Sequence, residues 1–568
     1  MNKDNKDFLF VHNKHRKWIL ILSIIVLLPN IYLAFYDSDI GGSSSWKIAI
    51  YLIASIFLFI LPSLFLKARN FFIVQGIFVI LAPFEIAHIY LNRMPATMAF
   101  LLSIIDTEWN ESTEMLSSLR LPILFLLLVW AFYFYVVFKK IRNRYFIRSK
   151  KIRAYISAFY IVFVLTGYSY YFTKMYPQNT HTVDTFKAAN EEVLLKFQKI
   201  YPYDLIIRVY QVYDTKNSIK DGCEKIKSFR FGAEKKETVA EREVYVFVIG
   251  ETGRYNSYAL NGYERNTSPL LSKTPDLISY SDCFSEANIT TSSLSILLTR
   301  ASAVDYKRSY IEKSFVDAFQ EAGFSTYWIA NQSANNNFVQ RIAEDATGEY
   351  FTTLSLSDEN YDEKLWSFLE EVLKKDEKKV FIVLHTLGSH FRYNFRYPGE
   401  FEVFQPCLEG AFDYNLISPK NKQQFINSYD NSILYTDYFL ANTIQKIDSL
   451  NAVSTLIYMA DHGENLFDTD DNIIFHGGGK YTEYDFHVPL FIWTSGKYKS
   501  QYPQKAENML HNKDKKLSAS AIFYSWLDIA DISFPEQKLT KSIASEFLKI
   551  DSARYVVDTN LEVKRLNF

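Results

Sequence analysis

Five long apolar stretches within the first 172 residues constrain the fold of this chain more than any other feature. They cover residues 18–36, 48–66, 71–91, 121–138 and 154–172. A helix needs about 20 apolar residues to cross a hydrocarbon core of about 30 Å, so each stretch can span a bilayer. The sequence therefore predicts a five-helix transmembrane domain at residues 1–172. Four spans follow the first, and no small-residue cleavage site is evident, so we expect it to be retained rather than removed as a signal peptide.

Basic residues in the short loops predict the orientation of these helices. Lysine and arginine are concentrated at residues 14–17, 67–69 and 139–153, and loops of this kind face the cytoplasm. The loop at residues 92–120 and everything after residue 172 then lie on the other side. We therefore expect the large C-terminal part to face the periplasm, or the outside of a cell with one membrane.

Two ionisable residues, Glu85 and His88, lie within the third apolar stretch. Such groups are costly in hydrocarbon, so we expect them to face a cavity or the membrane interface. Simple interfacial placement and a role in binding substrate both stay open. The loop at residues 92–120 is polar around 105–112, where a lipid headgroup would meet an external domain.

The rest of the chain divides into a connector and a second domain. Residues 173–240 form the expected connector, with an apolar run at 205–212 and a charged, loop-like stretch at 216–236. Residues 241–568 alternate strand and helix patterns, which predicts an α/β domain with a mostly parallel sheet. The expected buried strands are residues 244–250, 325–330, 380–385, 454–459 and 489–493. Such sheets place their ligands at the carboxyl ends of the strands.

Polar residues at two of these strand ends predict a metal site. Glu251 follows the strand at 244–250, and Asp461 with His462 follows the strand at 454–459. Carboxylate and imidazole groups are good Zn²⁺ ligands. Three protein ligands leave a fourth position open, which is the pattern of a catalytic zinc site rather than a structural one.

A run of hydroxyl residues offers candidates for a nucleophile at that fourth position. Residues 290–295 include five serine or threonine hydroxyls before an apolar, helix-like segment. Backbone N–H groups at a helix start bind phosphate, and zinc lowers the pKa of a hydroxyl. The residues alone do not choose among the five. Three histidines near strand ends favour a phosphate-binding or proton-transfer cluster: His390, His476 and His487.

Composition excludes several other classes of function. The 62 basic and 63 acidic residues nearly balance, so charge gives no sign of a nucleic-acid partner. The three cysteines, Cys223, Cys283 and Cys407, show no C-x-x-C spacing, which disfavours a thiolate metal cluster. We expect them to be unpaired thiols. The chain has no C-x-P-x-R or S-x-P-x-R segment, so a sulfatase with the modified nucleophile is disfavoured.

Several motifs in one order resemble the phosphoethanolamine transferases, sulfatase-like members of the alkaline phosphatase superfamily. These include lipid A, core-heptose and colistin-resistance enzymes. The matching segments are residues 247–254, 260–269, 384–390, 429–437 and 460–464. The resemblance implies transfer of phosphoethanolamine from phosphatidylethanolamine, through a phosphothreonine-type intermediate, to lipid A or the lipopolysaccharide core. It also implies a bacterial inner-membrane enzyme, and a monomer is our default expectation for its oligomeric state.

The resemblance also implies roles for particular residues. The family places its nucleophile about forty positions after the zinc-binding Glu, with a Ser three residues later; Thr290 and Ser293 fit, and Thr291 is the second choice. The implied zinc ligands are Glu251, Thr290, Asp461 and His462, and a second zinc ion stays open. The implied substrate contacts are His390, His476, His487, Thr107 and Glu111.

Departures from the family pattern place the chain nearer the cysteine-poor, core-heptose branch. With three cysteines, the chain cannot form the several disulfides of the lipid A enzymes. The position of a substrate-binding lysine in those enzymes falls near Asn335 or Asn336 here, and Ser103 replaces an asparagine of their membrane loop. The acceptor therefore stays open. The alternatives are a phosphoglycerol transferase of the same superfamily that uses phosphatidylglycerol, and a catalytically inactive membrane scaffold.

Overall fold

A computed structural model describes most of the chain. The described residues are 13–37, 45–106, 120–175, 185, 189–190, 193, 197–237, 239–332, 337–352, 360–410, 416–470, 472–550 and 553–567. The chain folds as two compact units. The first comprises Met1–Leu101 and Leu119–Asp214, and the second comprises Leu102–Ser118 and Thr215–Phe568. The chain passes from one unit to the other within helix α9 (Tyr203–Ser228).

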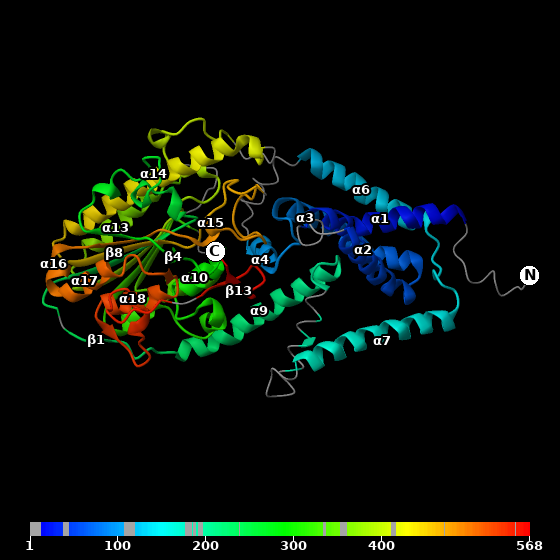
Figure 1. The fold of residues 1–568 in the computed structure, drawn as a ribbon, viewed down its shortest axis with the longest axis horizontal. Helices are drawn as coiled ribbons and strands as arrows, with labels where there is room; N and C mark the ends of the chain where they lie inside the picture. Colours follow the sequence, from blue (N-terminus) through cyan, green and yellow to red (C-terminus); the bar gives the residue numbers. More distant parts are fainter. Residues whose placement is uncertain are drawn as a thin grey trace, which may run out of the picture. The chain divides into compact units, whose positions relative to one another are not determined.

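The first unit is built from the five expected transmembrane helices (Figure 1). Among the described residues, five helices are long and apolar enough to cross a membrane. They are α1 (Asn13–Tyr36), α2 (Ser45–Ile60, extended by a 3-10 turn at Leu61–Leu64), α3 (Ala68–Asn92), α6 (Arg120–Lys140) and α7 (Lys150–Met175). Leu22, Phe72 and Tyr133 from three of these helices pack in one buried cluster. The prediction of five spans is confirmed.

Glu85 and His88 face the interior of this unit. Each side chain is 4% exposed. The Glu85 Oε1 atom accepts a hydrogen bond from the backbone N–H of Ala96, and the Nδ1 atom of His88 lies 3.1 Å from the carbonyl oxygen of Met94. Both side chains therefore face protein groups rather than solvent.

The second unit contains a seven-stranded sheet in the order β3-β9-β8-β2-β7-β5-β6. The expected strands are β2 (Glu243–Gly250), β5 (Ser325–Ala330), β7 (Lys379–His385), β8 (Val453–Ala460) and β9 (Leu490–Thr494). The two edge strands, β3 (Leu277–Tyr280) and β6 (Gly348–Phe351), were not expected. Only β9 runs antiparallel to both neighbours, so the mostly parallel sheet is confirmed.

Both faces of the sheet are buried, as a three-layer α/β architecture requires. Along β2, Tyr245 and Phe247 enter one hydrophobic cluster, whereas Val244 and Val246 enter the other. Helices α10 (Thr290–Leu297), α11 (Phe315–Glu321) and α18 (Ala521–Ile529) contribute to the first cluster. Helices α13 (Leu365–Leu373) and α14 (Lys422–Asp448) contribute to the second. The alternation follows from the two-residue side-chain period of a strand.

Shorter elements complete the description. Among the described residues, the other α-helices are α4 (Met98–Asp106), α12 (Asn337–Glu344), α15 (Glu483–Phe486), α16 (Gly496–Gln501) and α17 (Pro503–His511). Three two-stranded pairs are β1 (Glu234–Lys235) with β11 (Ile532–Ser533), β4 (Cys283–Phe284) with β10 (Leu517–Ser518), and β12 (Arg554–Val557) with β13 (Val563–Leu566).

Two smaller expectations are tested by these elements. The stretch at residues 216–236 is not loop-like throughout, because α9 continues to Ser228. Cys283 and Cys407 are buried free thiols, as expected for these two cysteines.

Candidate metal centre and nucleophile

The candidate site lies where two neighbouring strands end. The parallel register pairs Gly250, the last residue of β2, with Ala460, the last residue of β8. Glu251 follows β2, and Asp461 and His462 follow β8, so three side chains far apart in sequence meet at one sheet edge. One potential ligand atom from each lies within 4.8 Å of the others. The juxtaposition predicted from the strand ends is present.

The hydrogen bonds of Asp461 and His462 leave one ligand atom of each directed to the centre. The Oδ1 atom of Asp461 accepts from the backbone N–H groups of Thr252 and His462, at 3.1 and 2.7 Å. Its Oδ2 atom is buried and has no hydrogen-bond partner. The Nδ1 atom of His462 lies 2.9 Å from the carbonyl oxygen of Gly463. A carbonyl can only accept, so Nδ1 carries a proton, and Nε2 is the ring nitrogen that faces the centre.

This donor set fits a metal ion. The Nε2 atom of His462 lies 3.4 Å from Asp461 Oδ2 and 3.6 Å from Glu251 Oε1. A buried carboxylate oxygen without a donor is costly unless a cation compensates it. Two carboxylates and one imidazole are a ligand set that suits zinc.

The hydroxyl of Thr290 lies beside these ligands. Its Oγ1 atom is 3.3 Å from His462 Nε2 and 3.4 Å from Glu251 Oε1. Thr290 is the first residue of α10 and follows Ile289, whose backbone is extended. The first turn of a helix leaves N–H groups without intrahelical partners, and they can bind a phosphate oxygen.

The other hydroxyls of the run make different contacts. Ser293 donates to the carbonyl oxygen of Ala287, and Ser295 donates to that of Thr291. Ser292 is buried and Thr291 is exposed. Thr290 is the hydroxyl of this run whose oxygen lies within 3.4 Å of two of the metal-ligand candidates.

The electrostatics of the centre favour a bound cation. Burial would raise the pKa of Glu251, but His462, His390 and the Thr252 hydroxyl outweigh burial and lower it to about 2. Burial and the charge of Glu251 raise the pKa of Asp461 to about 7. Two buried carboxyl groups this close cannot both ionise easily without positive charge nearby.

Two of the three predicted histidines lie near the centre. The rings of His462 and His476 have centroids 4.1 Å apart. The Nδ1 atom of His476 lies 3.2 Å from Glu464 Oε1, and Tyr393 donates to the other oxygen of Glu464. His390, on the loop after β7, lies close enough to Glu251 to lower its pKa. These contacts place His390 and His476 around the same pair of strand ends.

His487 lies in a different environment. Its ring is stacked against Tyr255 and Phe284, with centroid distances of 4.1 and 4.8 Å. Its Nδ1 atom contacts Glu483 and its Nε2 atom contacts the carbonyl oxygen of Ser281. Both ring nitrogens therefore have protein partners. Thr107, Glu111, Asn335 and Asn336 lie outside the described residues.

Sequence reasoning missed three residues that hold Glu251 in place. Gln332 donates through Nε2 to Glu251 Oε2 at 3.2 Å and to the carbonyl oxygen of Thr386 at 2.9 Å. Thr252 has a left-handed backbone (φ 59°) and donates its hydroxyl to Glu251 Oε1. Gly388 has φ 49°, and a Cβ atom there would lie 2.9 Å from the backbone nitrogen and oxygen of Glu251. A β-branched residue at positive φ is strained, and such strain clusters at functional sites.

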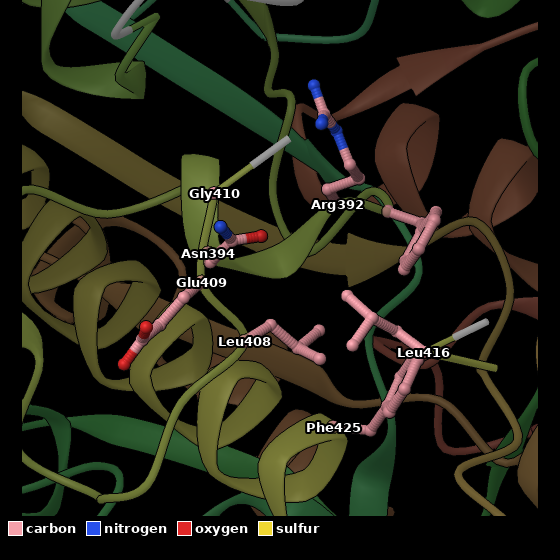
Figure 2. Close-up of a pocket in the computed structure, with 8 residues that line it drawn as sticks. Arg392, Asn394, Leu408, Glu409, Gly410, Leu416 and Phe425 are labelled. Carbon is pink, nitrogen blue, oxygen red and sulfur yellow. The ribbon is translucent and has the colours of Figure 1, made fainter. Parts of the chain in front are cut away.

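A separate apolar hollow adjoins the segment that follows His390. Its walls include Phe391 and Arg392, and Figure 2 shows Leu408, Leu416 and Phe425 grouped on one side of it. None of the metal-ligand candidates lines this hollow. It is therefore distinct from the metal centre, although one of its lining residues directly follows His390.

Comparison with known proteins shows several relatives. The family model described as Sulfatase matches residues 243–532. Phosphoethanolamine transferase EptC of Escherichia coli (strain K12) is 24% identical over 485 residues, which are 81% of this chain and 79% of that protein. Phosphoethanolamine transferase EptA of the same strain is 30% identical over 285 residues, 48% of this chain and 50% of that protein.

The chain is also similar to solved structures of proteins with these names. The periplasmic domain of EptC from Escherichia coli in complex with Zn is 25% identical, with a TM-score of 0.52, over 58% of this chain and 92% of that domain. The integral membrane protein lipooligosaccharide phosphoethanolamine transferase A (EptA) from Neisseria meningitidis matches 93% of this chain and 98% of that protein, with a TM-score of 0.68. At 20% identity, the EptA match shows the fold alone.

Proposed function

Because the chain belongs to the sulfatase family, whose model matches residues 243–532, we propose that it is a zinc-dependent phosphoethanolamine transferase of the bacterial inner membrane. The donor is phosphatidylethanolamine, and the acceptor is lipid A or the lipopolysaccharide core. The relatives named as phosphoethanolamine transferases support the transferred group. The carrying observation is the Thr290 hydroxyl within 3.4 Å of Glu251 and His462, beside the unpartnered Oδ2 of Asp461.

In this proposal Glu251, Thr290, Asp461 and His462 hold one zinc ion. When bound, zinc lowers the pKa of the hydroxyl and stabilises negative charge on phosphoryl oxygens. Gln332 and Thr252 fix the orientation of the Glu251 carboxylate through their hydrogen bonds. The backbone N–H groups that open α10 bind a phosphoryl oxygen. The contacts of Thr290 with Glu251 and His462 hold its oxygen in position for attack.

Transfer proceeds in two displacements at phosphorus. Thr290 Oγ1 forms a bond to phosphorus and loses its proton, while the bond from phosphorus to diacylglycerol oxygen breaks and that oxygen takes up a proton. An acceptor hydroxyl or phosphate oxygen then forms a bond to phosphorus and gives up any proton it carries, while the bond from phosphorus to Thr290 Oγ1 breaks and that oxygen regains a proton. His390 and His476 bind phosphoryl oxygens or carry these protons. Thr107 and Glu111 are our proposed contacts for the lipid headgroup.

Mass spectrometry of the purified full-length chain tests the nucleophile and the donor together. We expect a phosphoethanolamine adduct on the peptide that contains Thr290, and its loss in Thr290→Ala. Thr291→Ala is the matched control, since its side chain is exposed, and it should keep the adduct. An adduct that persists in Thr290→Ala would contradict the assignment. A phosphoglycerol adduct would instead support the phosphatidylglycerol alternative.

A second measurement identifies the acceptor. Envelope glycolipids from cells with and without the gene should differ by one phosphoethanolamine group, carried on lipid A or on the core. The Thr290→Ala variant should give the same spectrum as the deletion. A phosphoethanolamine difference on another envelope component would identify a different acceptor, and the assignment of Thr290 as the nucleophile would still hold.

A further inference from the structure

Between Tyr203 and Tyr213, α9 buries its charged side chains and exposes apolar ones. Asp204 and Arg208 are 1% and 3% exposed. The exposed residues are Ile206 (50%), Val209 (57%), Tyr210 (61%) and Tyr213 (65%). Their spacing of three and four positions puts them on one face of the helix. A helix in water has the opposite arrangement, because aspartate and arginine are seldom fully buried.

The buried charges have polar partners inside the first unit. Arg208 donates to Asp204 Oδ2 at 3.5 Å and to the carbonyl oxygen of Gln198 at 2.8 Å. The carboxyl group of Asp204 also lies close enough to that of Glu85 on α3 for the two to interact electrostatically. Ionisable groups at membrane depth face the protein interior and pair with one another in this way.

The start of α9 and the residues just before it reach far along the transmembrane helices. Tyr203 donates its hydroxyl to the carbonyl oxygen of Leu58, and Tyr201 donates to that of Phe78. Leu58 lies thirteen residues from Ser45, where α2 begins, and Phe78 lies fourteen residues before Asn92, where α3 ends. At a rise of about 1.5 Å per residue, both carbonyls lie about 20 Å from those helix ends. By the predicted topology, both ends lie on the external side.

The irregular backbone of this segment is bonded to the helices around it. Asn30 on α1 accepts from the N–H of Tyr201 and donates to the carbonyl oxygen of the same residue. Tyr51 on α2 donates to the carbonyl oxygen of Lys199. Non-helical backbone is tolerated at membrane depth only where protein groups satisfy it.

We propose that residues 197–213 form a re-entrant membrane element whose exposed face contacts lipid. Ile206 and Val209 contact acyl chains, and Tyr210 and Tyr213 lie at the level of the headgroups, where aromatic residues are enriched. The next exposed residue, Asp214, is charged, and it marks the membrane surface. From Tyr203 to Tyr213 the helix rises about 15 Å, which is half of a typical hydrocarbon core. The surface is continuous with that of the five spans, because Tyr201 and Tyr203 are bonded to α3 and α2.

Spin-label accessibility in reconstituted vesicles of phosphatidylethanolamine and phosphatidylglycerol tests this element. A nitroxide is attached to Ile206→Cys, Val209→Cys or, as the control, Lys216→Cys, in a background with serine at the three native cysteines. We expect oxygen to relax the first two labels several times more strongly than a water-soluble nickel complex does, and the order to reverse at Lys216. Strong relaxation by nickel at all three positions would overturn the proposal, as would low accessibility of Ile206 and Val209 to both reagents, which indicates protein packing.

A measurement without cysteine replacement covers the case in which that background does not fold, since Cys283 is buried. A benzoylphenylalanine photo-crosslinker placed at Val209 of the otherwise native chain should yield adducts with phospholipid. The same crosslinker at Lys216 should yield few. Equal lipid adducts at the two positions, or none at Val209, would overturn the proposal. Neither measurement depends on the transferase activity.

Discussion

Replacing Gln332 by alanine should weaken zinc binding without disturbing the fold. The side chain makes one hydrogen bond to the Glu251 carboxylate, at 3.2 Å, and one to the Thr386 carbonyl, at 2.9 Å. A hydrogen bond to a charged group contributes about 1.5–3 kcal/mol, and removing an outer-shell partner weakens metal binding about 10–100-fold. The bond is long, and Thr252 still donates to the other Glu251 oxygen. We therefore expect the low end, about tenfold or about 1.4 kcal/mol.

Competition with a chromophoric zinc chelator measures the loss on the full-length protein in detergent. Gln320→Ala is the matched control, because Gln320 also donates two bonds through Nε2, to Thr326 Oγ1 at 2.8 Å and to the carbonyl oxygen of Asp345 at 2.6 Å. None of these groups is a metal-ligand candidate. An unchanged zinc affinity in Gln332→Ala, or an equal loss in both variants, would refute the reasoning.

Three further changes follow from the same geometry. Gly388→Ala puts a Cβ atom 2.9 Å from the Glu251 backbone at a left-handed φ, and the left-handed backbone alone costs about 1–2 kcal/mol. Transferase activity should therefore fall more than tenfold. Gly399→Ala is the control and should leave activity unchanged, because the space around Gly399 is open. Burial and the charge of Glu251 raise the pKa of Asp461 to about 7, and zinc competes with the proton on this carboxyl group. Zinc affinity should therefore fall about tenfold per pH unit below pH 7 and level off above it. Chelator competition at several pH values measures this, and a flat profile would contradict it. Burial raises the pKa of Glu464 to about 8, which keeps the acid neutral near pH 7, so Glu464→Gln should keep its activity within about threefold and Glu464→Ala should lose it; an equally inactive glutamine variant would refute a neutral role.

The sequence predicts the central strands well because they are buried on both faces. β2 and β8 are eight buried residues each, and such continuous apolar runs stand out from their surroundings. The edge strands β3 and β6 have four residues each and are mostly half-exposed, so their pattern is indistinct. The direction of β9 was not predictable, since a run buried on both faces looks the same whichever way it points.

The residues of the site also divide into those that the sequence predicts and those that it does not. Glu251, Asp461 and His462 could be brought together from sequence because each follows a strand of one sheet, and parallel strands place their ends on one edge. Gln332 gave no such signal: its contact with Glu251 depends on a side-chain direction after β5. The role of Gly388 depends on how closely two loops approach, which no residue pattern expresses. Sequence therefore predicts which strand ends meet, and the structure adds what holds the ligands still.

The re-entrant element shows why a hydropathy pattern can miss membrane contact without any change in the predicted topology. In residues 203–213 the charges of Asp204 and Arg208 interrupt the apolar run, although both are buried against the protein. An average over a window of about 19 residues counts these charges against the segment as if they faced lipid. A segment that enters and leaves on one side adds no crossing, so the number of spans and the side of the C-terminal domain do not change. The loop-charge argument for an external catalytic domain therefore holds with or without this element, and the spin-label experiment tests the element alone.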